Sequence, residues 1–177
     1  GLDTVQFQSD AVTTNGGDLI VAADLITQDA AATLNAHAMS LNAASGGIEF
    51  NAAVVVTGEL TINAAGNVSQ NVAGSITAHD SLTVSANEIV LDLSSNDFQG
   101  SVSVSGTDVT LADANSIVLG DIDASDSLTV TAVSGSIDDG AETIAGGDVD
   151  VSGATTLIAF GTITLDDATN DFSGTVN

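Results

Sequence analysis

The feature that most constrains the fold is a short alternating phrase that recurs along the chain. The first apolar residues of its copies are Leu19, Met39, Leu60, Leu82, Val102, Leu128 and Val149. The phrase returns after about 21 residues each time, with one longer step between Val102 and Leu128. A period of this size is the signature of a repeat architecture, in which each unit stacks on its neighbours. The fold therefore has to bring equivalent residues to equivalent places once in every period.

A longer repeat overlies the short one. Segment 89–102 returns as segment 163–176 at an offset of 74, and both copies contain N-D-F-x-G-x-V. Phe98 and Phe172 occupy the same place in the two copies, and we expect both to stack in the interior. We interpret residues 1–177 as a single repeat domain cut from a longer solenoid.

Within each phrase the apolar residues alternate with polar ones, as in Leu82-Thr83-Val84-Ser85. A period of two places successive side chains on opposite faces of a β-strand. Clusters of Gly, Asn, Asp and Ser follow every few residues, and these residue types favour tight turns. Segment 29–42 comes nearest to a helical pattern, but polar residues interrupt its apolar face. The chain is therefore predicted to be strand and turn.

Short strands at this spacing are compatible with a β-sandwich or with a solenoid. A β-sandwich does not require the sequence to repeat at a fixed period. The stacked coils of a parallel β-helix do require such a repeat, so we favour an all-β parallel solenoid. About eight coils stacked about 4.8 Å apart would make a rod of roughly 40 Å. The seven phrase residues named above are expected to form the interior of one sheet, and another sheet receives Ile48, Ile89, Val109 and Ile163.

The chain resembles, over essentially its whole length, the repeats of giant bacterial surface proteins with filamentous-haemagglutinin-like β-helices, and residues 96–137 carry the clearest elements. The matching elements are Asn96–Val102, Val109–Asp113, Leu119-Gly120, Leu128–Ala132 and Gly135-Ser136-Ile137. The resemblance implies a right-handed parallel β-helix that serves as a structural or adhesive stalk of an extracellular, cell-surface adhesin. The implied partners are adjacent coils, other copies end to end, or the surface of a host or neighbouring cell.

The charge composition excludes several classes of partner and chemistry. The chain has 24 acidic residues and neither Lys nor Arg, so its formal net charge is -24. Nucleic acid binding, basic membrane patches and lysine-dependent catalysis all need the missing cations. Cysteine is absent too, which removes disulfides and thiolate metal sites. The sequence shows neither an apolar run of about 18 residues nor a signal peptide in this piece, so we expect no membrane span within it.

We expect no catalysis and no cofactor. Adjacent carboxylates such as Asp166 and Asp167 supply the residue type for glycoside hydrolysis. Cleavage of acidic sugars on a β-helix generally also uses Lys or Arg, and sugar stacking uses Trp or Tyr, and the chain has none of these. No G-x-S-x-G elbow is present to activate a hydroxyl nucleophile.

Aspartates cluster in a few turns, and calcium prefers such oxygen ligands. The start of a calcium-binding loop is similar to the segment that contains Asp121, Asp123 and Asp126. The sixth residue of this segment is not the Gly of such a loop, and the twelfth is not its Glu. Asp148 and Asp150 follow Gly146-Gly147 in a faint version of a calcium-binding nonapeptide. We interpret these side chains chiefly as solvated turn carboxylates. The alternative function is a calcium- or glycan-binding module with these five aspartates as weak calcium sites.

The two histidines do not add a metal site. His37 and His79 are two periods apart, which corresponds to two coils and about 10 Å along the rod, too far for one metal ion to bridge. The 24 charges on a rod of roughly 40 Å correspond to about one charge per 1.7 Å, close to duplex DNA. Copies of the rod are therefore expected to repel one another until salt or divalent ions screen them.

Overall fold

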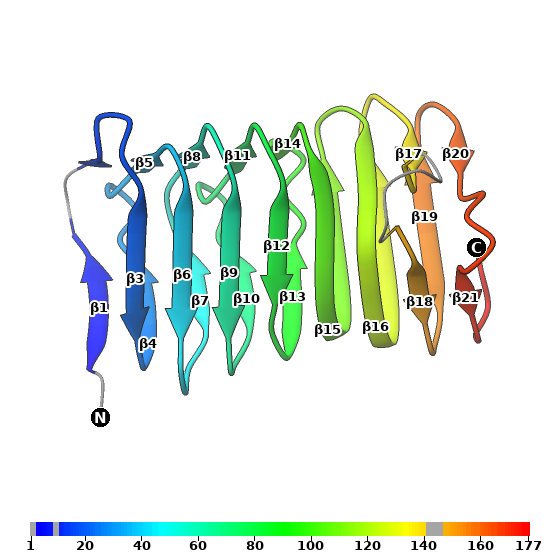
Figure 1. The fold of residues 1–177 in the computed structure, drawn as a ribbon, viewed down its shortest axis with the longest axis horizontal. Helices are drawn as coiled ribbons and strands as arrows, with labels where there is room; N and C mark the ends of the chain where they lie inside the picture. The colour runs from blue at the N-terminus through cyan, green and yellow to red at the C-terminus, as the bar shows by residue number, and fades with distance from the viewer. Residues whose placement is uncertain (1–2, 9–10, 141–146) are drawn as a thin grey trace.

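The chain is wound into a rod of stacked coils (Figure 1). The computed structural model describes residues 3–8, 11–140 and 147–177, and within these ranges it consists of strands and turns without a helix. Neighbouring coils pair through parallel strands. The two termini lie at opposite ends of the rod. The predicted all-β parallel solenoid of about eight coils is confirmed. Among the described residues there is no helix that is long and apolar enough to cross a membrane.

In the first five coils the strands form three sides. The β1 side contains β1 (Thr4–Phe7), β4 (Leu25–Gln28), β7 (Ile48–Phe50), β10 (Val68–Gln70) and β13 (Glu88–Leu91). The β3 side contains β3 (Leu19–Ala23), β6 (Met39–Ala43), β9 (Leu60–Ala64) and β12 (Leu82–Ser85). The third side is a separate five-stranded sheet of β2 (Val12–Thr13), β5 (Leu34–Ala36), β8 (Val54–Val56), β11 (Ile76–Ala78) and β14 (Asp97–Phe98).

Two long strands then join the β3 side to the β1 side. They are β15 (Ser101–Asp113) and β16 (Ile117–Ala132). β15 pairs with β12 of the β3 side and with β13 of the β1 side, and β16 pairs with β15 over its length. The last coils contain β17 (Ile137–Asp138), β18 (Val149–Val151), β19 (Thr155–Ala159), β20 (Ile163–Thr164) and β21 (Asp171–Phe172). The five-stranded sheet ends at β14, so the cross-section of the rod changes in the second half.

Interior side chains form columns that run the length of the rod. One column passes through eight successive register pairs, and its members are Val5, Ile26, Ile48, Val68, Ile89, Val109, Leu128, Thr155 and Val176. A second column contains Leu41, Ile62 and Val84, each at most 1% exposed. Full burial of such a side chain contributes about 1.5–3 kcal/mol. Small aliphatic residues fit because each one packs on a similar residue one coil away.

The predicted position of Leu128 is wrong. The repeat spacing predicts that Leu128 stacks on Val102. Instead Val102 pairs with Leu119, and Leu128 pairs with Val109 on the β1 side. The same L-x-V alternation serves on both sides of the rod, so spacing alone does not distinguish them. The predicted column was therefore wrong at this step, because Val102 and Leu128 belong to two different interior columns.

Val149 and Ile163 are also displaced from their predicted columns. Val149 lies on the expected side but pairs with Ile122, one column away, after a coil that is longer than the others. Ile163 pairs with Ile137 in a column of the last coils instead of extending that of Ile89. The number of residues per coil varies where the five-stranded sheet ends. Counting a fixed number of residues therefore no longer predicts which residues pair.

The two phenylalanines of the long repeat, Phe98 and Phe172, both pack against the core, but in different sheets. Phe98 is 2% exposed and pairs with Ala78 in the five-stranded sheet. Phe172 packs against the core from the larger sheet, where it pairs with Val151. The two N-D-F segments therefore lie in different sheets.

Candidate functional site

The most regular outward feature is a column of polar side chains on the β3 side and its continuation. Its members lie in register on neighbouring strands and change from amides and hydroxyls to carboxylates along the rod. In order they are Asn42, Asn63, Ser85, Ser105, Asp123, Asp150 and Asp171. The sequence prediction of Asp123 and Asp150 as candidate ligands falls on this column.

The three carboxylates of the column lie beside one another without a cationic neighbour, because the chain has no Lys or Arg. Asp150 pairs with Asp123 on one side and with Asp171 on the other, and all three are exposed. They border a shallow hollow of about 240 Å³ that Ser152 and Ser173 complete. Like charges directly opposite each other destabilise a sheet, so this column is an electrostatic cost that a bound cation would reduce.

The other predicted calcium ligands are not members of this column. Asp121 and Asp126 are exposed residues of β16, and Asp121 lines a hollow of about 210 Å³ together with Asp123. Asp148 Oδ1 lies within hydrogen-bond distance of the Thr169 hydroxyl oxygen. Within the described ranges, no group of three acidic or histidine side chains is placed to hold a metal ion. Gly146 of the nonapeptide-like motif lies outside those ranges, and calcium binding stays a prediction.

Hydrogen bonds also set the charge state of Asp167. The side-chain hydroxyl and the backbone N–H of Thr169 both donate to Oδ1 of Asp167. These bonds favour the carboxylate and lower the pKa of Asp167 from its usual value. The Asp167 carboxylate therefore stays ionised at a lower pH than an aspartate without these hydrogen bonds.

A buried polar corner was not predicted from the sequence. Asn96 is 0% exposed, and its Oδ1 accepts the Ile76 N–H at 2.9 Å. Its Nδ2 lies 3.1 Å from the carbonyl oxygen of Leu91, 3.2 Å from that of Ala112 and 3.0 Å from Gln70 Oε1, and its two hydrogens serve these acceptors. One side chain thus ties together backbone groups of three successive coils at a corner where the regular strand pairing is interrupted.

Asp113 places a carboxylate next to this corner. It is 0% exposed, and its two oxygens accept the N–H groups of Phe98 and Asn115, each at 2.6 Å. Burial raises the pKa of Asp113, the two N–H bonds oppose that shift, and the charge of Asp97 adds to it. Because turn carboxylates are usually solvated, no sequence pattern distinguished this aspartate from the others.

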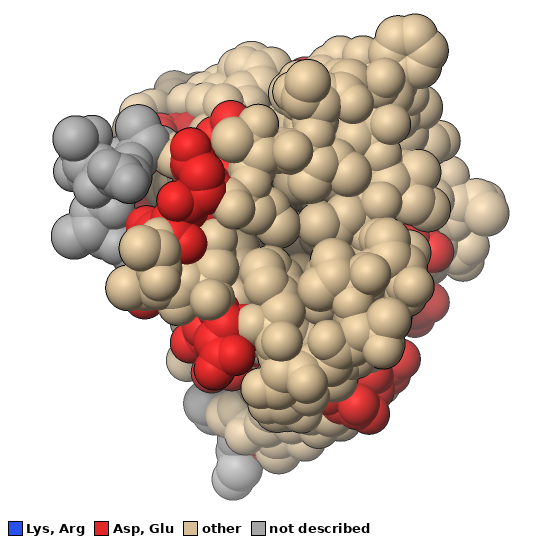
Figure 2. All heavy atoms as spheres, turned by 90° about the vertical axis from the view of Figure 1, so that its right-hand side faces the viewer, with Lys and Arg blue, Asp and Glu red and all other residues tan. Residues whose placement is uncertain are grey.

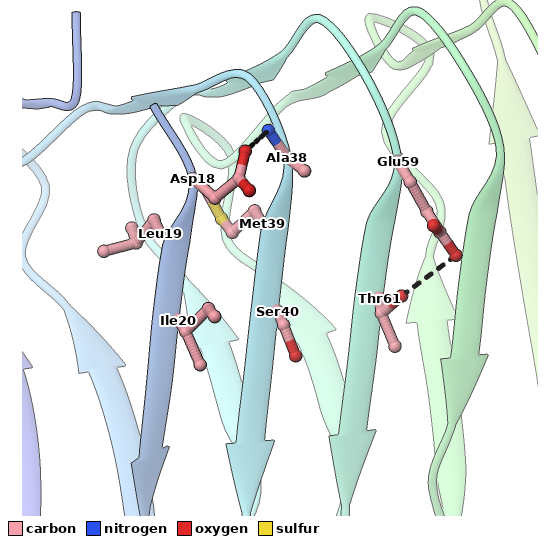
Figure 3. Close-up of a pocket in the computed structure, with 8 residues that line it drawn as sticks. All are labelled: Asp18, Leu19, Ile20, Ala38, Met39, Ser40, Glu59 and Thr61. Carbon is pink, nitrogen blue, oxygen red and sulfur yellow. Dashed lines mark hydrogen bonds between the residues drawn. The ribbon is translucent and has the colours of Figure 1, made fainter. Parts of the chain in front are cut away.

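Three other polar side chains are buried, those of Gln28, Asp139 and Thr155, whereas most of the remaining polar side chains are at least partly exposed. On the β3 side, Ile20, Ser40 and Thr61 line a hollow of about 140 Å³ with Asp18 and Glu59 at its edge (Figure 3). His37 Nδ1 lies 3.3 Å from Asp18 Oδ1, and His79 is exposed two coils away. Seen from the C-terminal end, the carboxylates form separate patches around the rim (Figure 2). Similar polar side chains on successive coils therefore form rows along the rod.

Comparison with known proteins gives one match. The family model described as repeats of unknown function (DUF5649) matches residues 36–105 and again residues 106–177. The boundary between the two matches falls within β15. Neither the search of curated proteins nor the search of solved structures returned a match.

Proposed function

The chain belongs to the family of DUF5649 repeats of unknown function, and we propose that it serves as a structural segment of an extracellular surface stalk. The observation that carries the proposal is the column from Val5 to Val176, which runs through every coil. Parallel strand pairing along that column resists bending and keeps the two ends of the segment apart. The resemblance to surface-protein repeats supports an adhesin as the whole protein.

An in-register tandem fusion tests the structural function. Thr175-Val176 continues the column that begins with Thr4-Val5, so residues 3–174 followed by residues 4–177 join without a slip. Eight further coil steps of about 4.8 Å predict an increase of about 38 Å in the maximum dimension measured by small-angle X-ray scattering. The fused protein is also expected to unfold at a higher temperature than the single segment.

The matched control has one extra residue inserted at the junction. A slip of one residue turns every following side chain of the strand to the opposite face, so the control is expected to behave as two rods joined by a flexible link. The structural proposal fails if the maximum dimension of the in-register fusion does not exceed that of the slipped control. It also fails if the melting temperatures of the two fusions are equal. Antibody labelling of intact cells of the source organism tests the extracellular location separately.

Calcium binding is the second candidate. Asp123, Asp150 and Asp171 do not form a three-ligand metal site, but their neighbouring like charges favour weak, diffuse binding of a divalent cation. We expect a weak, calcium-dependent rise in melting temperature that Asp150→Asn reduces, because this substitution removes the central carboxylate. Asp29→Asn serves as a control of equal charge at a distant turn. An unchanged melting temperature, together with no heat in titration calorimetry, would exclude this function.

A further inference from the structure

The outer face of the five-stranded sheet is depleted of charge. Segments 31–37, 52–58 and 73–79, which contain its three central strands, include none of the 24 acidic residues. At the average for the chain, 24 in 177, the three segments together would contain about three. Depletion of charged residues is the compositional mark of the core of a protein interface. On a polyanion, this face is also where a second polyanion can approach most closely.

The central outward column of this face is self-complementary. From β2 to β14 its members are in register, and they are Thr13, Asn35, Val55, Thr77 and Asp97. A two-fold axis at Val55 would place Val55 opposite Val55, Asn35 opposite Thr77, and Thr13 opposite Asp97. Each contact then joins groups that are compatible: two apolar groups, an amide with a hydroxyl, and a hydroxyl with a carboxylate.

We propose that this face is a contact surface for a second copy of the chain, packed antiparallel about a two-fold axis at Val55. The opposite, parallel arrangement would place Asp97 against Asp97. The antiparallel arrangement also separates the acid-rich ends, since residues 121–171 contain 11 of the 24 acidic residues. This inference goes beyond the structural function and does not rest on it, because a stalk segment need not pair laterally.

The area of the face sets the strength of the contact. The five strands of this sheet have two or three residues each, which is at most about 10 Å, and they lie about 4.8 Å apart, so the face covers roughly 240 Å² per copy. The total of about 480 Å² is well below that of standard stable interfaces and corresponds to a weak, transient contact. A hollow of about 220 Å³ beside Asn35 and Val55 leaves room for side chains of the facing copy. We therefore expect a dimer only at high protein concentration and at high salt, where the repulsion between rods is screened.

Sedimentation equilibrium near neutral pH tests this contact with a matched pair of variants. Val55 and Val90 are both half-buried outward valines in the middle of short strands, but Val90 lies on the β1 side between Ser69 and Thr110. In about 0.5 M salt, Val55→Asp is expected to weaken dimerisation more than about tenfold, because it places two carboxylates together at the axis. Val90→Asp adds the same charge and is expected to leave the dimer unchanged. Circular dichroism establishes that both variants fold.

A second pair of variants tests the contact through a gain. Thr13→Lys is expected to strengthen the dimer several-fold, because each lysine meets Asp97 of the second copy. Thr27→Lys, on the β1 side, removes the same net charge without that contact. The proposal is overturned if the wild-type chain stays monomeric at high concentration and high salt. It is also overturned if the two lysine variants strengthen the dimer equally, or if the two aspartate variants weaken it equally.

Discussion

Truncation of the buried Asn96 side chain gives the most direct test of how the coils are held together. In Asn96→Ala the Ile76 N–H and at least one of the carbonyl oxygens of Leu91 and Ala112 lose their partner inside the rod. Each buried polar group left without a partner costs about 1–3 kcal/mol, so two such groups cost about 2–6 kcal/mol. This is a large part of the stability of a typical domain, which is about 5–15 kcal/mol.

Urea unfolding followed by circular dichroism measures this loss, and hydrogen exchange at the Ile76 amide localises it. Asn42→Ala is the matched control, because Asn42 is an exposed, outward asparagine in the middle of β6. Its substitution is expected to change the free energy of unfolding by less than about 0.5 kcal/mol. If Asn96→Ala costs no more than Asn42→Ala, or if the Ile76 amide stays equally protected, the corner does not hold the coils in the way described.

Three further substitutions test the core, the buried charge and the close approach of coils. Leu41→Ala is expected to cost about 2–5 kcal/mol in urea unfolding, whereas Leu25→Ala, at a position 37% exposed, costs much less. The raised pKa of Asp113 means that its contribution to stability is complete at low pH and is lost as pH rises through the folded-state pKa. Asp113→Asn therefore removes this loss, which unfolding curves between about pH 3 and 7 will detect. Gly74→Ala would place Cβ 2.0 Å from the Phe50 carbonyl oxygen and is expected to lower the melting temperature; an unchanged value would contradict that packing.

The fold was predictable because its main determinant is periodic. A nearly constant repeat and a strict alternation of apolar with polar residues leave few ways to bury aliphatic side chains, and β3, β6, β9 and β12 follow the predicted register. The prediction failed at Leu128, where the coil length changes and two sides of the rod carry the same alternation. Residue spacing measures distance along the chain, whereas the column that a side chain joins depends on where each turn ends.

The polar interior was not predictable for a different reason. Asn96 and Asp113 stand among Ser, Asn and Asp residues that normally mark exposed turns. Their burial depends on backbone groups of neighbouring coils, which lie a whole coil or nearly so away in the sequence. Asp123 and Asp150 were predicted as carboxylates of two separate clusters, and their position beside each other and beside Asp171 required the register of three strands.

The different placements of Phe98 and Phe172 have a consequence for how such a chain evolves. The two family matches, 36–105 and 106–177, are each longer than three coils and shorter than four, because one coil takes about 21 residues. The two copies therefore begin on different sides of the rod, and a feature common to both copies faces a different direction in each. A substitution copied from one repeat into the other would alter two different sides of the rod, while the loss or gain of one whole coil would change only its length.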